Sequence, residues 1–401
     1  MSPLAEVAGR PSSRADLQVL FFVRFLRAVG FGFSAVLIGL YFQDRNVTPL
    51  EIGIVLAVGF AAAALTGLVS ANAQGRFGRR RTLAATGVLM MICGIVLAFA
   101  TSYWLFMLAA LTGMLGVAGT DTGPFLSVEQ AVLTDATTAA GRNRAFGRYS
   151  LTGALAGAAG GLLASFGSDV PRIQALFVLY AVIGLATAGL PLLLSPAIEG
   201  ETGAPTFGNL KPLIGLSALF GIDSFGSGLV ARSILAYWLH LKFGATPAVL
   251  GPTFAAMQLL GALAFELAGR LADRIGLINT MVFTHLPSNL MLVIFPFLPG
   301  LWWAIGLLII WSAAQSMDVP ARQAYVVSIV KPHERSGAVA VTGLVRGLAS
   351  AAGPAITGAA IQTAALGTPF FVAGATKALY DLALYIGFRS RHAEHEVRAT
   401  P

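Results

Sequence analysis

Charged side chains lie inside several of the longest apolar stretches of this sequence, where a charge is costly unless it has a use. Arg27 and Asp223 stand out, because each is followed by glycine three and five residues later. A carboxyl group in apolar surroundings binds a proton more readily than one in water, and a nearby arginine opposes this. These residue types therefore predict proton or solute binding. A static ion pair that orders the protein is the alternative interpretation.

Two further acids and one arginine belong to the same set of deep charges. Asp121 and Asp318 each stand two or three residues before a proline, which frees a backbone carbonyl and can kink a helix. We expect both acids to line a cavity wall that flexes. A kink whose missing bond is filled by the acid is the alternative. Arg346 is expected either to contact an anion or to pair with Asp318 or Asp223.

These charges must be positioned by helices that cross a membrane. The chain is 56% hydrophobic and 11% charged, whereas soluble proteins carry roughly 25% charged residues. A helix of about 20 apolar residues spans a bilayer. This criterion predicts an all-α integral membrane protein with twelve transmembrane spans, at 18–42, 50–74, 80–100, 103–128, 147–166, 172–194, 212–240, 247–269, 278–298, 300–328, 337–361 and 369–388.

The second half of the chain repeats the first. Shifts of 193 to 198 residues superpose Gly53 on Gly251, Arg27 on Asp223, Glu129 on Arg322 and Gly78 on Gly276. Parallel repeats about an axis along the membrane normal are one of the known plans for membrane transport proteins. We predict two pseudo-symmetric six-helix bundles at 18–195 and 212–388, joined by a cytoplasmic linker at 196–211, with tails at 1–17 and 389–401.

The basic residues gather in loops on one predicted side of the membrane. The net charge of +8 would suit nucleic acid, but 17 basic residues fall on the side of the two termini and three on the other. Such an excess marks the cytoplasmic side. We therefore expect a multi-pass protein of the cytoplasmic membrane with both termini in the cytoplasm. No nucleic-acid partner is expected, and the protein is predicted to be a monomer in the lipid bilayer.

Two apolar stretches end in similar charged loops, half a chain apart. The loops contain Arg76, Gly78, Arg79 and Arg80 in the first half and Gly269, Asp273, Arg274 and Gly276 in the second. This pattern resembles the signature loop of the major facilitator superfamily, G-x-L-A-D-R-x-G-R-[RK], which the second half matches as GRLADRIG. The first half has Gly75 where the family has Asp. The sequence resembles an uncharacterised bacterial branch of that superfamily.

The resemblance implies positions for the deep charges. Helices one, four, seven and ten of the superfamily line a central cavity, so we expect Arg27 and Asp223 to face each other across it. It also implies a cytoplasmic gate network of charges, formed by Arg76, Arg79, Glu129, Glu266, Asp273, Arg274 and Arg322. Solvated interface charges are the alternative. Lys377 and Asp381, spaced i and i+4, are expected to pair with each other.

The leading functional prediction is a secondary active transporter that moves a small organic solute by alternating access, coupled to protons and directed to export. An importer of the same fold and a non-transporting receptor or scaffold are the alternatives. The sequence has no Walker A loop, which argues against ATP as the driver. The five histidines are predicted to fall near helix ends, in loops or in the tail, without metal-ligand spacing. We therefore expect neither an enzyme nor a metal or other cofactor.

Overall fold

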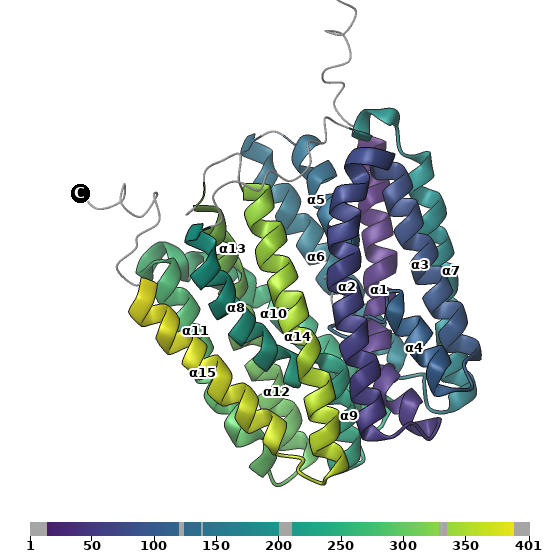
Figure 1. Ribbon diagram of the computed structural model, residues 1–401, viewed down its shortest axis with the longest axis vertical. Helices are drawn as coiled ribbons and strands as arrows, with labels where there is room; N and C mark the ends of the chain where they lie inside the picture. Colours follow the sequence, from purple (N-terminus) through teal and green to yellow (C-terminus); the bar gives the residue numbers. More distant parts are fainter. Residues whose placement is uncertain are drawn as a thin grey trace, which may run out of the picture.

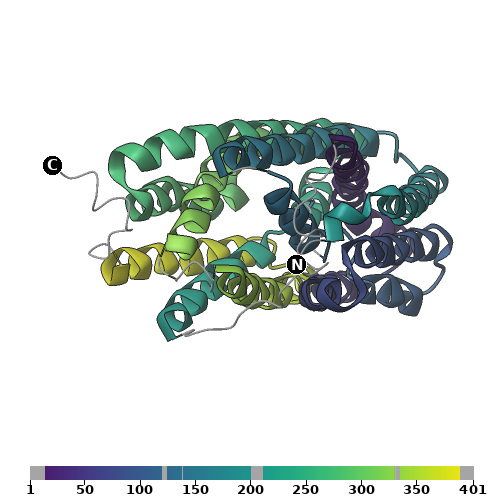
Figure 2. The same cartoon turned by 90° about the horizontal axis from the view of Figure 1, so that it is seen from above.

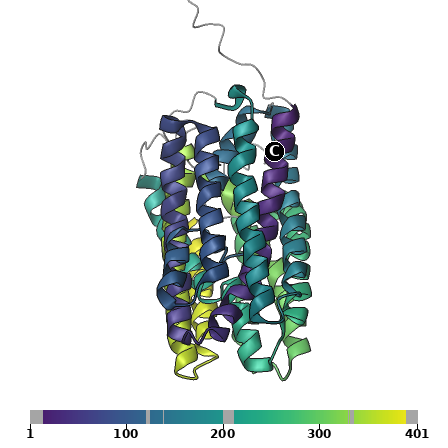
Figure 3. The same cartoon turned by 90° about the vertical axis from the view of Figure 1, so that its right-hand side faces the viewer.

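Long helices, roughly parallel to one another, make up most of the structure. The computed structural model describes residues 14–119, 124–137, 139–199, 211–328, 330 and 335–388. Figure 1 shows the first half of the chain, in purple and blue, beside the second half, in green and yellow. Figure 2 shows the same two groups viewed along the helices, and Figure 3 shows that the helices follow the longest axis.

The N-terminal bundle begins at Arg14, slightly earlier than predicted. Its helices are α1 (Arg14–Asp44), α2 (Pro49–Phe77), α3 (Arg79–Phe99), α4 (Tyr103–Leu111), α5 (Pro124–Asp135), α6 (Ala139–Ala164) and α7 (Val170–Gly189). Two short 3-10 helices follow, η2 (Leu190–Leu193) and η3 (Pro196–Glu199). The start of the predicted linker is therefore η3, and residues 200–210 lie outside the described part.

The C-terminal bundle begins at Lys211. It consists of α8 (Lys211–Leu229), α9 (Arg232–Phe243), α10 (Pro247–Ile275), α11 (Leu277–Ile294), η4 (Phe295–Phe297), α12 (Leu301–Ser316), α13 (Asp318–Ser328), α14 (Arg335–Gln362) and α15 (Thr368–Phe388). Within the described chain, nine helical segments are long and apolar enough to cross a membrane. The remaining predicted spans, 103–128, 147–166 and 369–388, coincide with α4–α5, α6 and α15. The predicted all-α membrane fold is confirmed.

The two bundles use the same device to turn from their second long helix into the third. Gly78 joins α2 to α3 with φ 86°, and Gly276 joins α10 to α11 with φ 85°. Side chains with a Cβ rarely adopt this backbone conformation, which glycine reaches without strain. In both turns the glycine N–H bonds to the carbonyl oxygen four residues earlier. The repeat predicted from Gly78 and Gly276 therefore extends to the backbone geometry.

Three of the predicted spans are broken helices rather than continuous ones. The fourth unwinds after α4, where Gly113, Gly116 and Gly119 take φ values of 73°, 69° and 65°. These left-handed residues cannot continue a right-handed helix. The seventh span breaks between α8 and α9, where the freed carbonyl of Leu229 accepts a hydrogen bond of 2.8 Å from Thr357 of α14. The tenth breaks at Met317, between α12 and α13.

Close contacts between the bundles gather at one end of the helices. We call the end where α1 begins and α15 ends the terminal side, and the opposite end the far side. On the far side α2 crosses α14 so closely that a Cβ on Gly53 would lie 2.3 Å from the carbonyl oxygen of Pro354. A Cβ on Gly251 of α10 would lie 2.6 Å from the carbonyl oxygen of Gly161 in α6. Gly251 is the repeat counterpart of Gly53, so the two crossings are pseudo-symmetric.

Toward the terminal side the bundles separate. A Cβ on Gly347 of α14 would still lie 2.6 Å from the Cβ of Ala64 in α2, near the middle of both helices. One turn closer to the terminal side, a Cβ on Gly343 would have no described atom within 4 Å. Figure 1 shows α2 and α14 together at the far side and spread apart toward the terminal side.

The buried apolar side chains follow the same asymmetry. One core cluster runs through the N-terminal bundle and joins residues such as Phe33 and Leu37 to residues of the C-terminal bundle that all lie on its far half, such as Leu235 and Trp238. A second cluster, which includes Phe220, belongs to the terminal half of the C-terminal bundle alone. Among the described residues the bundles therefore share a core only on the far side.

Candidate functional site

A fully buried ion pair lies inside the N-terminal bundle. Arg27 of α1 donates two parallel hydrogen bonds of 2.7 Å to the carboxylate of Glu129 in α5. Both side chains are 0% exposed. The guanidinium carbon lies 4.0 Å from the centre of the Phe125 ring, and the hydroxyl of Tyr149 in α6 donates to Glu129. This two-bond geometry is the strongest form of the interaction between arginine and a carboxylate.

A larger buried cluster occupies the C-terminal bundle. Lys377 of α15 donates a hydrogen bond of 2.7 Å to Asp223 of α8. Arg322 of α13 lies 3.5 Å from Asp223 and 2.5 Å from Asp318, one helical turn before it. All four side chains are buried. Each charge therefore has a partner of opposite sign, as buried charges require.

The glycines that follow Arg27 and Asp223 allow neighbouring helices to approach. A Cβ on Gly32 of α1 would lie 2.4 Å from the carbonyl oxygen of Gly157 in α6. A Cβ on Gly228 of α8 would lie 2.1 Å from the carbonyl oxygen of Ser350 in α14. The helices therefore pack closely at both places.

The predicted pairing of Arg27 with Asp223 across the interface is wrong. Each is bonded inside its own bundle, Arg27 to Glu129 of α5 and Asp223 to Lys377 of α15. The repeat nevertheless relates the two sites, since Glu129 and Arg322 are repeat counterparts as well. The contact between Arg322 and Asp223 is thus the contact between Glu129 and Arg27 with the signs exchanged. The sequence contains this signal, because the sign inverts at both repeat positions.

The expected pairing of Lys377 with Asp381 is also wrong. Asp381 is 0% exposed and accepts a hydrogen bond of 2.7 Å from Asn289. Its other partner is His285, whose Nδ1 lies 3.0 Å away. His285 lies in the middle of α11 and is 1% exposed, so it is not a helix-end histidine as predicted. It falls inside the predicted span 278–298, so extending the criterion for deep charges to neutral titratable groups would have found it.

Arg346 of α14 is half-buried, and its Nε donates a hydrogen bond of 3.0 Å to the hydroxyl of Ser224. Ser224 is the residue next to Asp223, so Arg346 joins the edge of the C-terminal cluster through a neutral group. Asp318 is bonded to Arg322 inside that cluster. Asp121 lies outside the described residues.

The charged loop of the first half is fastened to the end of the N-terminal bundle. The carboxylate of Glu199 in η3 accepts hydrogen bonds from the backbone N–H groups of Arg79, at 2.5 Å, and Arg80, at 3.3 Å. These groups are the unpaired donors at the start of α3, where a negative charge is favoured. The Arg79 side chain bonds to Asp135 at 2.6 Å and to the carbonyl of Ile198 at 2.9 Å.

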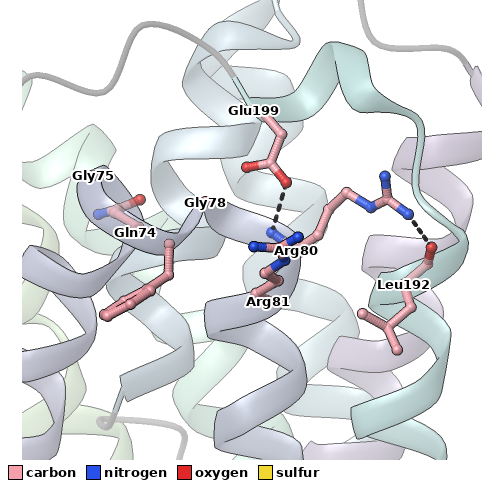
Figure 4. Close-up of a pocket in the computed structure, with 8 residues that line it drawn as sticks. Gln74, Gly75, Gly78, Arg80, Arg81, Leu192 and Glu199 are labelled. Carbon is pink, nitrogen blue, oxygen red and sulfur yellow. Dashed lines mark hydrogen bonds between the residues drawn. The ribbon is translucent and has the colours of Figure 1, made fainter.

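Figure 4 shows Glu199, Gly78 and Arg80 among the residues that line a pocket of about 510 Å³. Arg80 donates to the carbonyl oxygen of Leu192. A Cβ on Gly78 would lie 2.7 Å from the Glu199 carboxylate, so glycine is needed there for space as well as for its positive φ. The linker thus supplies a carboxylate beside the loop in which Gly75 replaces the acidic residue of the family signature.

Among the residues that the structure describes, no ion pair joins the seven charges of the predicted gate network to one another. Glu129 and Arg322 lie inside the bundles, because Arg27 and Asp318 hold them there. Glu266 is exposed and pairs with Arg270 one turn away, at 3.2 Å. Arg76, Gly269, Asp273 and Arg274 are exposed on the terminal side.

Two pseudo-symmetric helical bundles, in contact at one end and carrying buried charges and broken helices, follow a known plan of membrane transporters. The chain belongs to the Major Facilitator Superfamily, whose profile matches residues 20–226 and 216–401. It is a solute transporter of that superfamily rather than an enzyme.

Comparisons with known proteins extend over nearly the whole chain. An uncharacterized membrane protein of Saccharomyces cerevisiae, YJR124C, is 23% identical over 431 residues, which cover 96% of each protein. The crystal structure of a mutant of the nucleoside transporter NupG aligns with a TM-score of 0.75 at 15% identity, over 93% of this chain and all of the other. The crystal structure of a D-xylose–proton symporter aligns with a TM-score of 0.72 at 15% identity, over 92% of this chain and 97% of the other. At these identities the two structures show a shared fold.

Proposed function

We propose that the protein is a proton-coupled exporter of a small organic solute in the cytoplasmic membrane. Both termini lie in the cytoplasm, in keeping with the excess of basic residues in the loops on that side. In the conformation described here the terminal side is then open to the cytoplasm and the far side is closed. The asymmetry of the contacts between the bundles carries this proposal: α2 and α14 touch at Gly53 and Gly358 and no longer at Gly343.

Coupling to protons is supported by the buried carboxylates. Glu129, Asp223, Asp318 and Asp381 are all at most 2% exposed. Ionisable groups at membrane depth are typical of proton relays in transporters. One of the structural neighbours is, by its name, a proton symporter. A proton gradient is therefore the driving force that we propose.

The direction of transport and the class of solute are inferred from which polar groups already have partners within the protein. Inside each bundle the charges are paired with one another, while the aromatic residue Tyr237 of α9 packs against α1 of the other bundle. This arrangement suits an amphiphilic organic solute more than a sugar held by many hydrogen bonds. We propose export as the direction, with import by the same fold as the alternative.

We expect transport in proteoliposomes to be driven by a pH gradient in which the outside of the vesicle is more acidic than the inside. Nucleosides, pentoses and a library of amphiphilic drugs serve as the first probes, selected by thermal shift of the purified protein. A ligand at 100 times its Kd adds about 2.7 kcal/mol to the stability of the folded state. A stabilising probe is then radiolabelled and its flux is measured with and without the gradient.

The sign of the effect separates the alternatives. Faster efflux of preloaded probe under outside-acid conditions supports proton-coupled export, whereas faster uptake under the same gradient indicates import. Flux that ignores the gradient contradicts proton coupling. A probe that stabilises the protein but never crosses the membrane indicates a receptor or scaffold.

A further inference from the structure

A histidine lies between two carboxylates in the interior of the C-terminal bundle. His285 of α11 has its Nδ1 3.0 Å from Asp381 of α15 and its Nε2 3.7 Å from Asp223 of α8. None of the three side chains is more than 3% exposed. The two ring nitrogens therefore point to acids on two different helices.

The protonation state of His285 decides whether both of its ring nitrogens can donate a hydrogen bond to the acids that they face. A neutral imidazole has one N–H and one unprotonated nitrogen, while an imidazolium has two N–H groups. When His285 is neutral and donates to Asp381, its other nitrogen presents a lone pair to Asp223. One additional proton turns both contacts into attractive ones.

Asp381 depends on that proton more than the other acids of the cluster. Asp223 is already paired with Lys377 and Asp318 with Arg322. Within the described chain, the ion-pair partner of Asp381 is His285, and its second hydrogen bond comes from the neutral Asn289. A buried carboxylate without a cation is costly, so the pair formed by His285 and Asp381 favours an additional proton.

The remaining charged and titratable groups around His285 come from the helices packed on α11. Lys377 and Tyr380 lie on α15, and Arg322 and Asp318 lie on α13. Arg346 lies on α14, which packs on α8 beside Asp223. The ring centre of Tyr380 lies 6.0 Å from that of the His285 imidazole. The charged residues of α10 are exposed near its terminal end, and the sequence of α12 contains none.

Two buried polar atoms at this site have no hydrogen-bond partner among the described residues. They are the hydroxyl of Tyr380 and the side-chain oxygen of Asn289. Both residues are at most 2% exposed. Native structures leave few buried polar atoms unpaired, and such atoms are frequent at functional sites. They add capacity for a proton or its carrier beside His285 and Asp381.

We propose that His285 and Asp381 form a proton-binding pair, and that its proton controls the position of α8. The proton binds to Nε2 of His285, and the resulting imidazolium holds Asp223, and with it α8, against α11 and α15. Its release weakens that contact. The inference rests on the proton coupling of the proposed function and assigns it to a site inside one bundle.

The position of α8 reaches the interface between the bundles through the break that follows it. After Val230 and Ala231 the chain continues as α9, which packs on α1 of the other bundle. A Cβ on Gly39 of α1 would lie 2.9 Å from the Cβ of Tyr237 in α9. A shift of α8 therefore moves α9, which is in close contact with α1 of the opposite bundle.

The test measures the proton directly and requires no solute. The full-length protein, labelled with ¹⁵N-histidine and reconstituted in lipid bilayers, is titrated between about pH 5 and 8 while ¹⁵N shifts distinguish imidazole from imidazolium. We expect a signal that gains one proton in this range and disappears in His285→Gln. In Asp381→Asn the signal should remain, but the ratio of imidazolium to imidazole at a given pH should fall by up to about tenfold. His240→Gln, at a histidine bonded to the carbonyl of Ala245, should leave the signal unchanged.

The outcomes separate this inference from the proposed function. If His285 titrates as described but transport ignores a pH gradient, the proton site stands and the proposed coupling fails. If a pH gradient drives transport while His285 stays in one protonation state throughout, the coupling stands and this site is wrong. Unchanged titration in Asp381→Asn also overturns the pair, because the carboxylate then has no influence on the histidine.

Discussion

Glu129→Gln is expected to lower the free energy of unfolding by about 3–5 kcal/mol, because it breaks a buried ion pair by removing the carboxylate that binds Arg27. Both side chains of this pair are 0% exposed and share two hydrogen bonds of 2.7 Å. Arg27→Met should destabilise the protein by a similar amount, since it leaves the buried carboxylate without its cationic partner. Unfolding by SDS in mixed micelles, followed by intrinsic fluorescence, measures the difference.

The double variant distinguishes a buried pair from two separate losses. Arg27→Met combined with Glu129→Gln removes both charges and keeps an acceptor for Tyr149, so it should recover most of the stability. Arg172→Gln is the matched control, because Arg172 and its partner Asp169 are 66% and 47% exposed. Exposed pairs contribute about 0–1 kcal/mol. Additive losses in the double variant would contradict the pairing.

Gly53→Ala is expected to oppose closure of the far side. The added Cβ would lie 2.3 Å from the carbonyl oxygen of Pro354 and 3.0 Å from the Cα of Gly358. Neither backbone group can move aside without separating α2 from α14. Overpacking of this kind costs about 1–3 kcal/mol, which lowers the population of the closed far side about 5- to 150-fold. Transport should slow accordingly, and the distance between labels at Leu50 and Thr363 should increase.

Gly343→Ala is the matched control for this substitution. It lies on α14 as well, but its Cβ would have no described atom within 4 Å. It should leave both the label distance and the transport rate unchanged. Gly251→Ala, at the repeat counterpart of Gly53, should act in the same direction as Gly53→Ala. Equal behaviour of Gly53→Ala and Gly343→Ala would show that the crossing of α2 and α14 does not limit closure.

The sequence predicted the fold well because its signals are long. Twelve apolar runs, the repeat and the position of Gly78 and Gly276 depend on many residues at once. The partners of the charges were harder, because the depth of a residue in the membrane does not specify the direction in which its side chain points. Arg27 and Asp223 were placed at the right repeat positions, yet each points to a helix of its own bundle.

Local breaks and neutral groups were also missed for identifiable reasons. The fourth span was treated as continuous on its hydropathy, although glycine recurs every three residues at Gly113, Gly116 and Gly119. That spacing is a usable signal, since all three adopt a positive φ. His285 is predicted to lie near a helix end, in a loop or in the tail, and a criterion that counts only charged residues within apolar runs does not single it out. The contact of Glu199 with α3 links distant parts of the chain, and no local pattern predicts it.

In alternating access the two bundles rock against each other, so that they close the far side and the terminal side in turn. Spin labels on cysteines at Leu50 and Thr363 report the far side of α2 and α14, and labels at Asn72 and Val339 report their terminal side. Both pairs are introduced into a Cys93→Ala background and measured by double electron–electron resonance in lipid bilayers, across a pH series and with a stabilising probe. Alternating access predicts reciprocal changes, in which the terminal distance shortens as the far distance lengthens. Two distances that stay fixed, or that change in the same direction, would contradict it.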